Sequence, residues 1–282
     1  MYRPVASTTR SSVCGIANPR GPLPLLIIRP CRELATVSPM GTSQIPTDVD
    51  AAIKQCWPDG VVEAFATDES YFHEIHQRLE WDLRHVRGAS LLWQTEGEEV
   101  GARWEEGESD EPTPNDEWQS YHVFFLAPDG GEFHFEDETA GVEEPEDPEG
   151  KAGAEITYPG EGWIGCAAGI SLAAPYADIN LGSYSCYEDG TMSTPDVESF
   201  IYSGETHERV DTDQYHREIL SQEAFQQLEA LRRQIASILA KHRIQVLDKP
   251  VLDLRVPGLK AGTDVFLEEP LRVRDIFFFR GV

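Results

Sequence analysis

The sequence lacks any apolar run long enough to cross a membrane. A membrane-spanning helix needs about 18 consecutive apolar residues, and no stretch of the 282-residue chain approaches that length. Hydrophobic residues still make up 40% of the chain and include six Trp, nine Tyr and twelve Phe, which supply enough material for a substantial core. The composition therefore predicts a soluble, globular protein with no membrane partner.

Paired cysteine motifs are also absent. Cys14, Cys31, Cys56, Cys166 and Cys186 show no CxxC spacing and no regular interval, which argues against a disulfide framework. The last three are expected to be reduced, mostly buried thiols. This usage predicts a cytoplasmic protein.

The chain has no phosphate-binding loop, no dinucleotide-binding glycine pattern and no zinc-ligand spacing. The stretch PGEGWIG at residues 159–165 is rich in glycine, but it lacks the basic residue and the helix that a phosphate cradle needs. These absences predict that the protein uses no cofactor. Direct binding of nucleic acid is not expected either, because a net charge of −27 repels phosphates unless a basic patch is segregated.

Acidic residues are almost missing from the first 39 residues, which hold five Arg, no Lys and one Glu. This segment carries +4 and the remainder −31. Three interpretations stay open: sequence upstream of a true start at Met40, an organellar transit peptide, or a part of the structure. In the first two, residues 1–39 are a dispensable basic extension and residues 40–282 form a single domain.

Basic residues, in turn, are almost missing from residues 94–150, which hold 20 acids and one base, Arg103. The most acidic part, EFHFEDETAGVEEPEDPEG at residues 132–150, has nine carboxylates. Its second half cannot bury apolar surface. Residues 139–153 are therefore predicted to be an acidic loop insert, exposed or disordered.

Apolar residues recur at helical spacing in residues 47–57, 68–88 and 221–243. Other segments have the composition of strands, namely residues 89–95, 118–138, 156–203 and 244–282. Because the strands are grouped before and after long helices, they do not alternate as in a doubly wound fold. We expect an α+β fold, a mainly antiparallel β-sheet with two or three amphipathic helices packed on it.

Residues 118–138 contain two β-forming runs around a Pro-Asp-Gly-Gly sequence, which is typical of a hairpin. If residues 128–131 form its loop, Phe124 faces Phe135 and, on the same side, His122 faces Asp137. An adjacent Asp raises the pKa of an imidazole and fixes its tautomer, as a general base or a metal ligand requires. The plainer interpretation is a polar pair that closes an apolar face.

Other residues are weaker candidates for chemistry. Cys166 lies among small residues, but it directly follows Gly165 and so fails the GxCxG pattern of a nucleophile elbow. His134, between two glutamates on a strand, and the pair His73 and His76 on a helix could contribute to a metal site, although the HExxH spacing is absent. We expect a buried thiol and solvated or packed imidazoles, and no bound metal.

Two functions from different classes follow. The first is an acidic protein-binding module that captures a basic protein partner, an immunity or inhibitor protein being one form of it, since clustered carboxylates steer association and reject wrong partners. The alternative is a hydrolase or metal-dependent enzyme with a site around His122 and Asp137. The sequence favours the first. The predicted partner-binding residues are Glu132, Glu136, Asp137, Glu138, Glu143, Glu144, Glu146 and Asp147.

Overall fold

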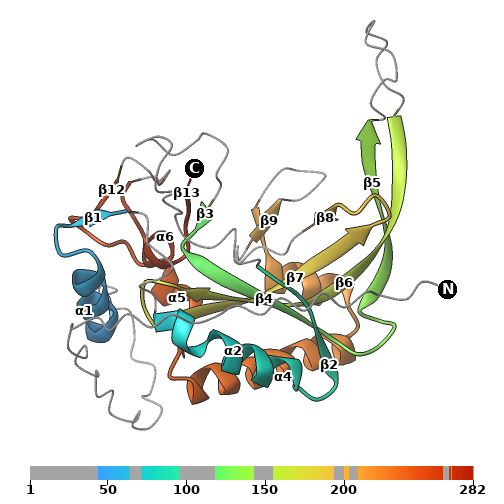
Figure 1. Cartoon of the computed structure of the whole chain (residues 1–282), viewed down its shortest axis with the longest axis horizontal. Coiled ribbons are helices and arrows are strands. Elements are labelled where there is room, and N and C mark those ends of the chain that lie inside the picture. Colours follow the sequence, from blue (N-terminus) through green and yellow to red (C-terminus); the bar gives the residue numbers. More distant parts are fainter. Residues whose placement is uncertain are drawn as a thin grey trace, which may run out of the picture. The chain divides into compact units, whose positions relative to one another are not determined.

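A mainly antiparallel β-sheet organises the part of the chain that the computed structural model describes (Figure 1). The described residues are 44–63, 71–95, 118–142, 155–193, 200–202, 209–262, 267 and 269–281. All of them belong to one unit, Ser43–Val282. The N-terminal extension and the loop carboxylates Glu143, Glu144, Glu146 and Asp147 lie outside the described residues.

The main sheet has the strand order β11-β7-β6-β4-β2, with β5 also paired to β6 and β8 to β7. Its strands are β2 (Ala89–Gln94), β4 (Tyr121–Pro128), β5 (His134–Val142), β6 (Glu155–Ser171), β7 (Tyr176–Tyr187), β8 (Met192–Ser193) and β11 (Gln245–Val246). Only β11 joins it in parallel. Short pairs join β1 (Val61–Val62) to β12 (Lys260–Ala261), β3 (Trp118–Gln119) to β13 (Arg280–Gly281), and β9 (Phe200–Tyr202) to β10 (Arg209–Asp211).

Helices pack on both faces of this sheet. They are α1 (Thr47–Cys56), α2 (Tyr71–Arg84), α3 (Thr212–Ile219), α4 (Gln222–Lys241), α5 (Lys249–Leu252) and α6 (Val273–Phe277). Helices α2 and α4 lie side by side against one face (Figure 1), while residues of α1, α5 and α6 pack on the other. The predicted α+β class is confirmed. Among the described residues, no helix is long and apolar enough to span a membrane.

The two long helices form where the apolar spacing predicted them. In α4, Leu228, Leu231 and Ile235 are buried at three- and four-residue steps and meet the sheet residues Phe124 and Cys166. The helix begins after Ser221, whose Oγ accepts a hydrogen bond from the Ala224 amide at 3.1 Å. This side chain satisfies one of the free amides of the first turn.

The predicted hairpin over residues 118–138 is wrong. Strands β4 and β5 do not pair with each other, because both run antiparallel to the long strand β6 and follow one another along it. Between the facing pairs Leu126–Cys166 and His134–Trp163, the chain has seven residues on one side and two on the other. The Pro-Asp-Gly-Gly sequence thus forms a bulge in a continuing line of strand.

The bulge is held on both sides, which explains why it does not reverse the chain. The Asp129 amide donates to the Gly88 carbonyl at 2.9 Å, and the Phe133 carbonyl accepts from the Ile164 amide at 2.8 Å. Phe133, only 2% exposed, belongs to the same core as Phe124. Burial of this ring returns the chain to β6 in the same direction.

The true hairpin is formed by β5 and β6. The predicted loop at residues 139–153 is therefore wrong at its start, since Thr139–Val142 belong to β5 and face Glu155–Tyr158. Backbone hydrogen bonds between the two strands stabilise this stretch. They do not depend on apolar side chains, so the low hydrophobicity of the stretch did not indicate a strand.

The C-terminal region was predicted as strands alone, which is wrong in two places, and α3 was not predicted. In α5, Pro250 occupies the first turn, where a fixed φ suits a helix. In α6, the Arg272 amide donates to the Asp275 side chain at 2.8 Å. In α3, the Asp211 carboxylate accepts from the amides of Asp213 and Gln214. A proline in the first turn of α5 and side-chain hydrogen bonds at the starts of α3 and α6 thus favour these short helices.

Candidate functional site: an acidic groove

A groove with a volume of about 830 Å³ lies over β5, β6 and β7. Its lining residues are Glu136, Asp137, Glu138, Pro159, Gly160, Glu161, Trp163, Cys186, Tyr187 and Glu188. Four of these are glutamates, and none is Lys or Arg. The groove is therefore a concave surface of one charge sign, built on paired strands.

Strand register decides which side chains face the groove together. Glu136 of β5 lies directly opposite Glu161 of β6, and Glu161 lies opposite Cys186 of β7. Residues opposite each other in an antiparallel sheet share a face, and like charges there are destabilising. The closest imidazole is that of His134, whose Nε2 lies 3.7 Å from a Glu161 carboxylate oxygen. The sheet thus places Glu136 and Glu161 side by side on one face.

An aromatic row borders the carboxylates. The Trp163 ring lies 5.3 Å from the His134 ring and 5.8 Å from the Tyr184 ring, centroid to centroid. Tyr184 is buried, whereas Trp163 is half-buried and reaches the groove. A half-exposed indole beside carboxylates can contact the alkyl stem and the charged end of a Lys or Arg side chain.

Asp137 has a different position from its two glutamate neighbours. Its Oδ2 accepts hydrogen bonds from Ser185 Oγ at 2.6 Å and Tyr187 Oη at 2.9 Å, so its carboxylate lies on the other face of the sheet. The Ser185 bond is the main reason that the pKa of Asp137 is lowered. Asp137 therefore anchors β5 to β7 across β6.

Glycines in β6 make this crossing possible. A Cβ at Gly160 would lie 2.5 Å from the Tyr187 ring, and one at Gly162 would overlap the Phe135 ring. The glycines of this stretch thus leave room for side chains of the neighbouring strands, which lie directly over the β6 backbone.

Glu136 and Glu138, two of the predicted partner-binding residues, lie together in the lining of the groove. Glu132 is exposed in the bulge and does not line it. Glu161 and Glu188 were missed. The alternation of Glu161 and Trp163 in the sequence was the available signal, but it has no meaning until β6 is known to be the hairpin partner of β5.

The predicted pairing of His122 with Asp137 is wrong. His122 faces Ile170 and Asp137 faces Gly160, ten residues apart along β6, which corresponds to roughly 30 Å at the rise of a strand. His122 is 4% exposed and packs against the Phe72 and His76 rings of α2. Burial, and then the neighbouring His76, lower its pKa to about 3, the reverse of what an adjacent Asp would do.

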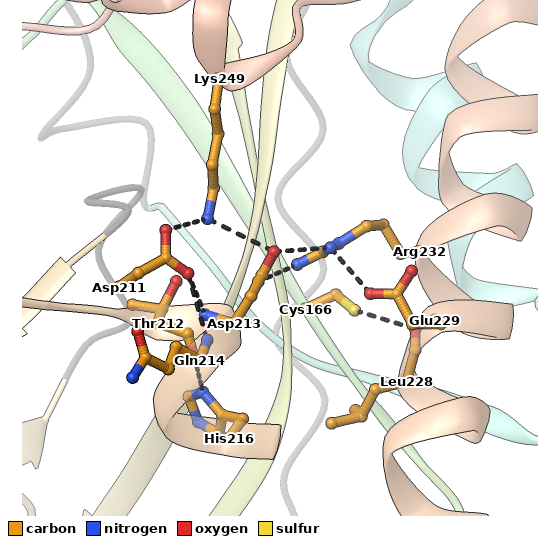
Figure 2. A network of polar contacts seen from close by, with 10 residues as sticks. All are labelled: Cys166, Asp211, Thr212, Asp213, Gln214, His216, Leu228, Glu229, Arg232 and Lys249. Carbon is orange, nitrogen blue, oxygen red and sulfur yellow. Dashed lines mark hydrogen bonds and ion pairs between the residues drawn. The ribbon is translucent and has the colours of Figure 1, made fainter. Parts of the chain in front are cut away.

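Cys166 lies deep in the core. Its thiol donates to the Leu228 carbonyl at 3.7 Å, and burial raises its pKa to about 12. A thiol that stays protonated is a poor nucleophile. Figure 2 shows Cys166 beside a network of ion pairs, with the carbonyl of Leu228 on α4 as its contact.

The network in Figure 2 joins three helices through charged side chains. Arg232 of α4 donates to Asp213 of α3 and to Glu229 at 2.8 Å, and Lys249 of α5 lies 2.9 Å from Asp211 and 3.3 Å from Asp213. Burial alone would raise the pKa of Asp213, but Arg232 and Lys249 lower it. All these charges have partners, so the network serves to hold α3.

The metal candidates do not converge. His73 is exposed on α2, His76 packs on His122 and Phe124, and His134 faces the groove. Across the described ranges, no group of three or more His, Cys, Asp or Glu side chains could hold a metal ion.

The three thiols in the described part of the chain are free and differ in exposure. Cys166 is buried and Cys56 is partly buried, whereas Cys186 is exposed. Cys186 lines the groove, because it shares a face with Glu161.

No protein-family model, curated protein or solved structure matches this chain. The geometry of the groove is therefore the basis for a functional proposal.

Proposed function

We propose that this protein is an acidic protein-binding module that captures a basic partner in the groove over β5, β6 and β7. One observation carries the proposal: Glu136 and Glu161 face each other on adjacent strands in a groove whose lining has no Lys or Arg. Such an arrangement costs stability in the free protein. A cation placed between the two carboxylates would remove that cost, which favours the bound state.

The site suits a protein partner because its charges are already positioned. Glu136, Glu138 and Glu161 lie on paired strands, so binding does not have to order the backbone that carries them. The half-buried Trp163 adds a contact for the carbon stem of a basic side chain. Three free cysteines are compatible with a cytoplasmic location, which we include in the proposal.

The test is a comparison of three forms of the full chain as baits in a native lysate. One form is unchanged. The second carries Glu136→Gln, Glu138→Gln and Glu161→Gln, which remove groove charge. The third carries Glu63→Gln, Glu74→Gln and Glu223→Gln at exposed positions outside the groove, so its net charge matches that of the second. Bound proteins are identified by mass spectrometry at low and high salt.

We expect one dominant basic protein that the unchanged and the third form retain at low salt and that the second form loses. Equal recovery by the second and third forms would mean that only the overall charge acts, and the proposal would be wrong. An empty result for all three forms would also count against it.

A further inference from the structure

The outer edge of β5 has no strand beside it in the part of the chain that the structure describes. β5 pairs with β6 on one side only, whereas β4, on the same line, has β2 on its other side. An edge strand of nine residues presents an outer row of backbone N–H and C=O groups, to which another chain can add a strand. The Glu138 amide donates to the Asp137 carboxylate at 2.9 Å, and an added strand would have to replace this bond. This edge borders the acidic groove.

The side chains along this edge have the spacing of a strand ligand. Glu136 and Glu138 point to the groove face, with the Asp137 side chain on the other face. Alternate residues of a strand are about 6.8 Å apart. An added strand with basic residues at alternate positions would therefore place each of them beside one of these glutamates.

A second copy of the chain is a poor occupant of the same edge. If two β5 strands paired antiparallel about Asp137, each Glu136 would lie opposite the Glu138 of the other copy. Like charges directly opposite each other are destabilising, and the two chains would each carry a net charge of −27. The charge of the edge thus selects against self-association and for a basic strand.

We infer that the partner binds as an extended segment that adds a strand to the free edge of β5, with Lys or Arg at alternate positions facing Glu136 and Glu138. This inference rests on the proposed function and specifies how the partner is held. The backbone of the partner forms hydrogen bonds with β5, and its basic side chains determine the register in which it pairs.

The experiment uses a heptapeptide in which Lys alternates with Val as the probe, and the full chain as the receptor. Two further peptides have the same sequence but carry N-methyl groups on one or the other set of alternate backbone amides. Their charge is unchanged, but in each case one edge of the peptide cannot donate hydrogen bonds. Fluorescence anisotropy at low salt gives the three dissociation constants, and hydrogen exchange reports the protection of the β5 amides.

We expect the unmodified peptide to bind and to protect β5 but not α4. One N-methylated peptide should bind similarly, and the other at least about tenfold more weakly, because methylation removes the hydrogen-bond donors on the peptide edge that faces β5. The double variant Glu136→Gln and Glu138→Gln should weaken all three.

The outcomes separate the two proposals. If both N-methylated peptides bind as tightly as the unmodified one, strand addition is wrong but capture by charge stands. If no Lys-containing peptide binds at low salt, capture by the groove is itself overturned. Protection confined to elements other than β5 would also overturn strand addition.

Discussion

Two facing glycines differ sharply in what surrounds them. Gly165 of β6 lies opposite Gly182 of β7. A Cβ at Gly165 would overlap the Leu126 carbonyl and lie 2.8 Å from the Phe125 ring, whereas a Cβ at Gly182 would meet nothing within 4 Å. Close approach of β4 to β6 therefore requires glycine at one position of the pair and not at the other.

We predict that Gly165→Ala lowers the free energy of unfolding by about 2–4 kcal/mol, because backbone atoms of β4 must move. Gly182→Ala is the matched control. It should leave stability unchanged or raise it by about 0.5–1 kcal/mol, since Ala in a strand interior loses less backbone entropy on folding. Urea denaturation of both variants checks this, and equal losses would contradict the packing described here.

His122 makes stability depend on pH. Its folded pKa of about 3 lies below the ordinary value of 6.5, so the unfolded chain binds a proton that the native protein refuses. The contribution of His122 is complete above pH 6.5 and is lost as the pH falls toward 3, by up to about 1.4 kcal/mol per pH unit. The charged form of the neighbouring His76 acts in the same direction as burial.

We predict that His122→Phe makes the unfolding free energy less dependent on pH between pH 6 and 4. The reduction in slope should correspond to about one proton fewer taken up on unfolding. The ring is retained for packing with Phe72 and Phe124, so the variant should fold. Chemical denaturation at several pH values gives the two slopes. Parallel curves for the variant and the unchanged protein would show that His122 does not titrate as described.

At the scale of elements, α3 depends on charged contacts more than α2 or α4 do. Thr212 and His216 are its buried residues, and Asp213 connects it to both Arg232 and Lys249. The Arg232 and Asp213 side chains are 20% and 23% exposed. Loss of one partner would leave a partly desolvated charge without compensation.

We predict that Arg232→Met costs roughly 2–3 kcal/mol of stability and increases hydrogen exchange in α3 before α4. Lys54→Met is the control, because the Lys54–Asp50 pair is exposed at 73% and 40%. That change should cost less than about 0.5 kcal/mol. Similar losses in the two variants would mean that the network does not hold α3.

Helices with an apolar stripe that repeats over several turns could be predicted from the sequence. Elements that depend on contacts between residues distant in sequence could not. The apolar stripes of α2 and α4 carry their own evidence, since each repeats over several turns. The β4–β5 region does not, because a Pro-Asp-Gly-Gly sequence is compatible with both a turn and a bulge. Burial of Phe133 and the hydrogen bond from Ile164 to its carbonyl decide between them, and both come from residues distant in sequence.

The same limit applies to the candidate site. Glu136 and Glu138 could be chosen from the sequence because they lie in a β-forming acidic run, and both line the groove. Glu161, Trp163 and Glu188 join them only through the pairing of β5, β6 and β7. The His122–Asp137 site failed for the same reason, since one wrong strand pairing produced it.

At the scale of the whole molecule, the proposed capture depends on charge before contact is made. The net charge of −27 creates a long-range field that attracts a basic protein before contact, whereas the groove acts only at short range. Salt screens the first effect more than the second, because the Debye length falls from about 30 Å at 0.01 M to about 8 Å at 0.15 M.

We predict that raising NaCl from about 10 to about 150 mM slows association with the captured partner by at least about tenfold and changes dissociation less. Surface plasmon resonance at several salt concentrations separates the two rates. The groove variant with three Glu→Gln changes should instead dissociate faster at every salt concentration. A salt effect on dissociation alone would contradict this division.

The far ends of β5 and β6 form a two-stranded ribbon, and the length of this ribbon can vary independently of the rest of the fold. Thr139–Val142 face Glu155–Tyr158, beyond the groove residues Glu138 and Pro159 and beyond the first β7 pair at Gly160–Tyr187. Removal or addition of one facing pair there changes the reach of the ribbon by one rung, and two rungs restore the original alternation of faces. The length of the β5–β6 ribbon can therefore change by two facing pairs at a time while the groove and the core keep their contacts.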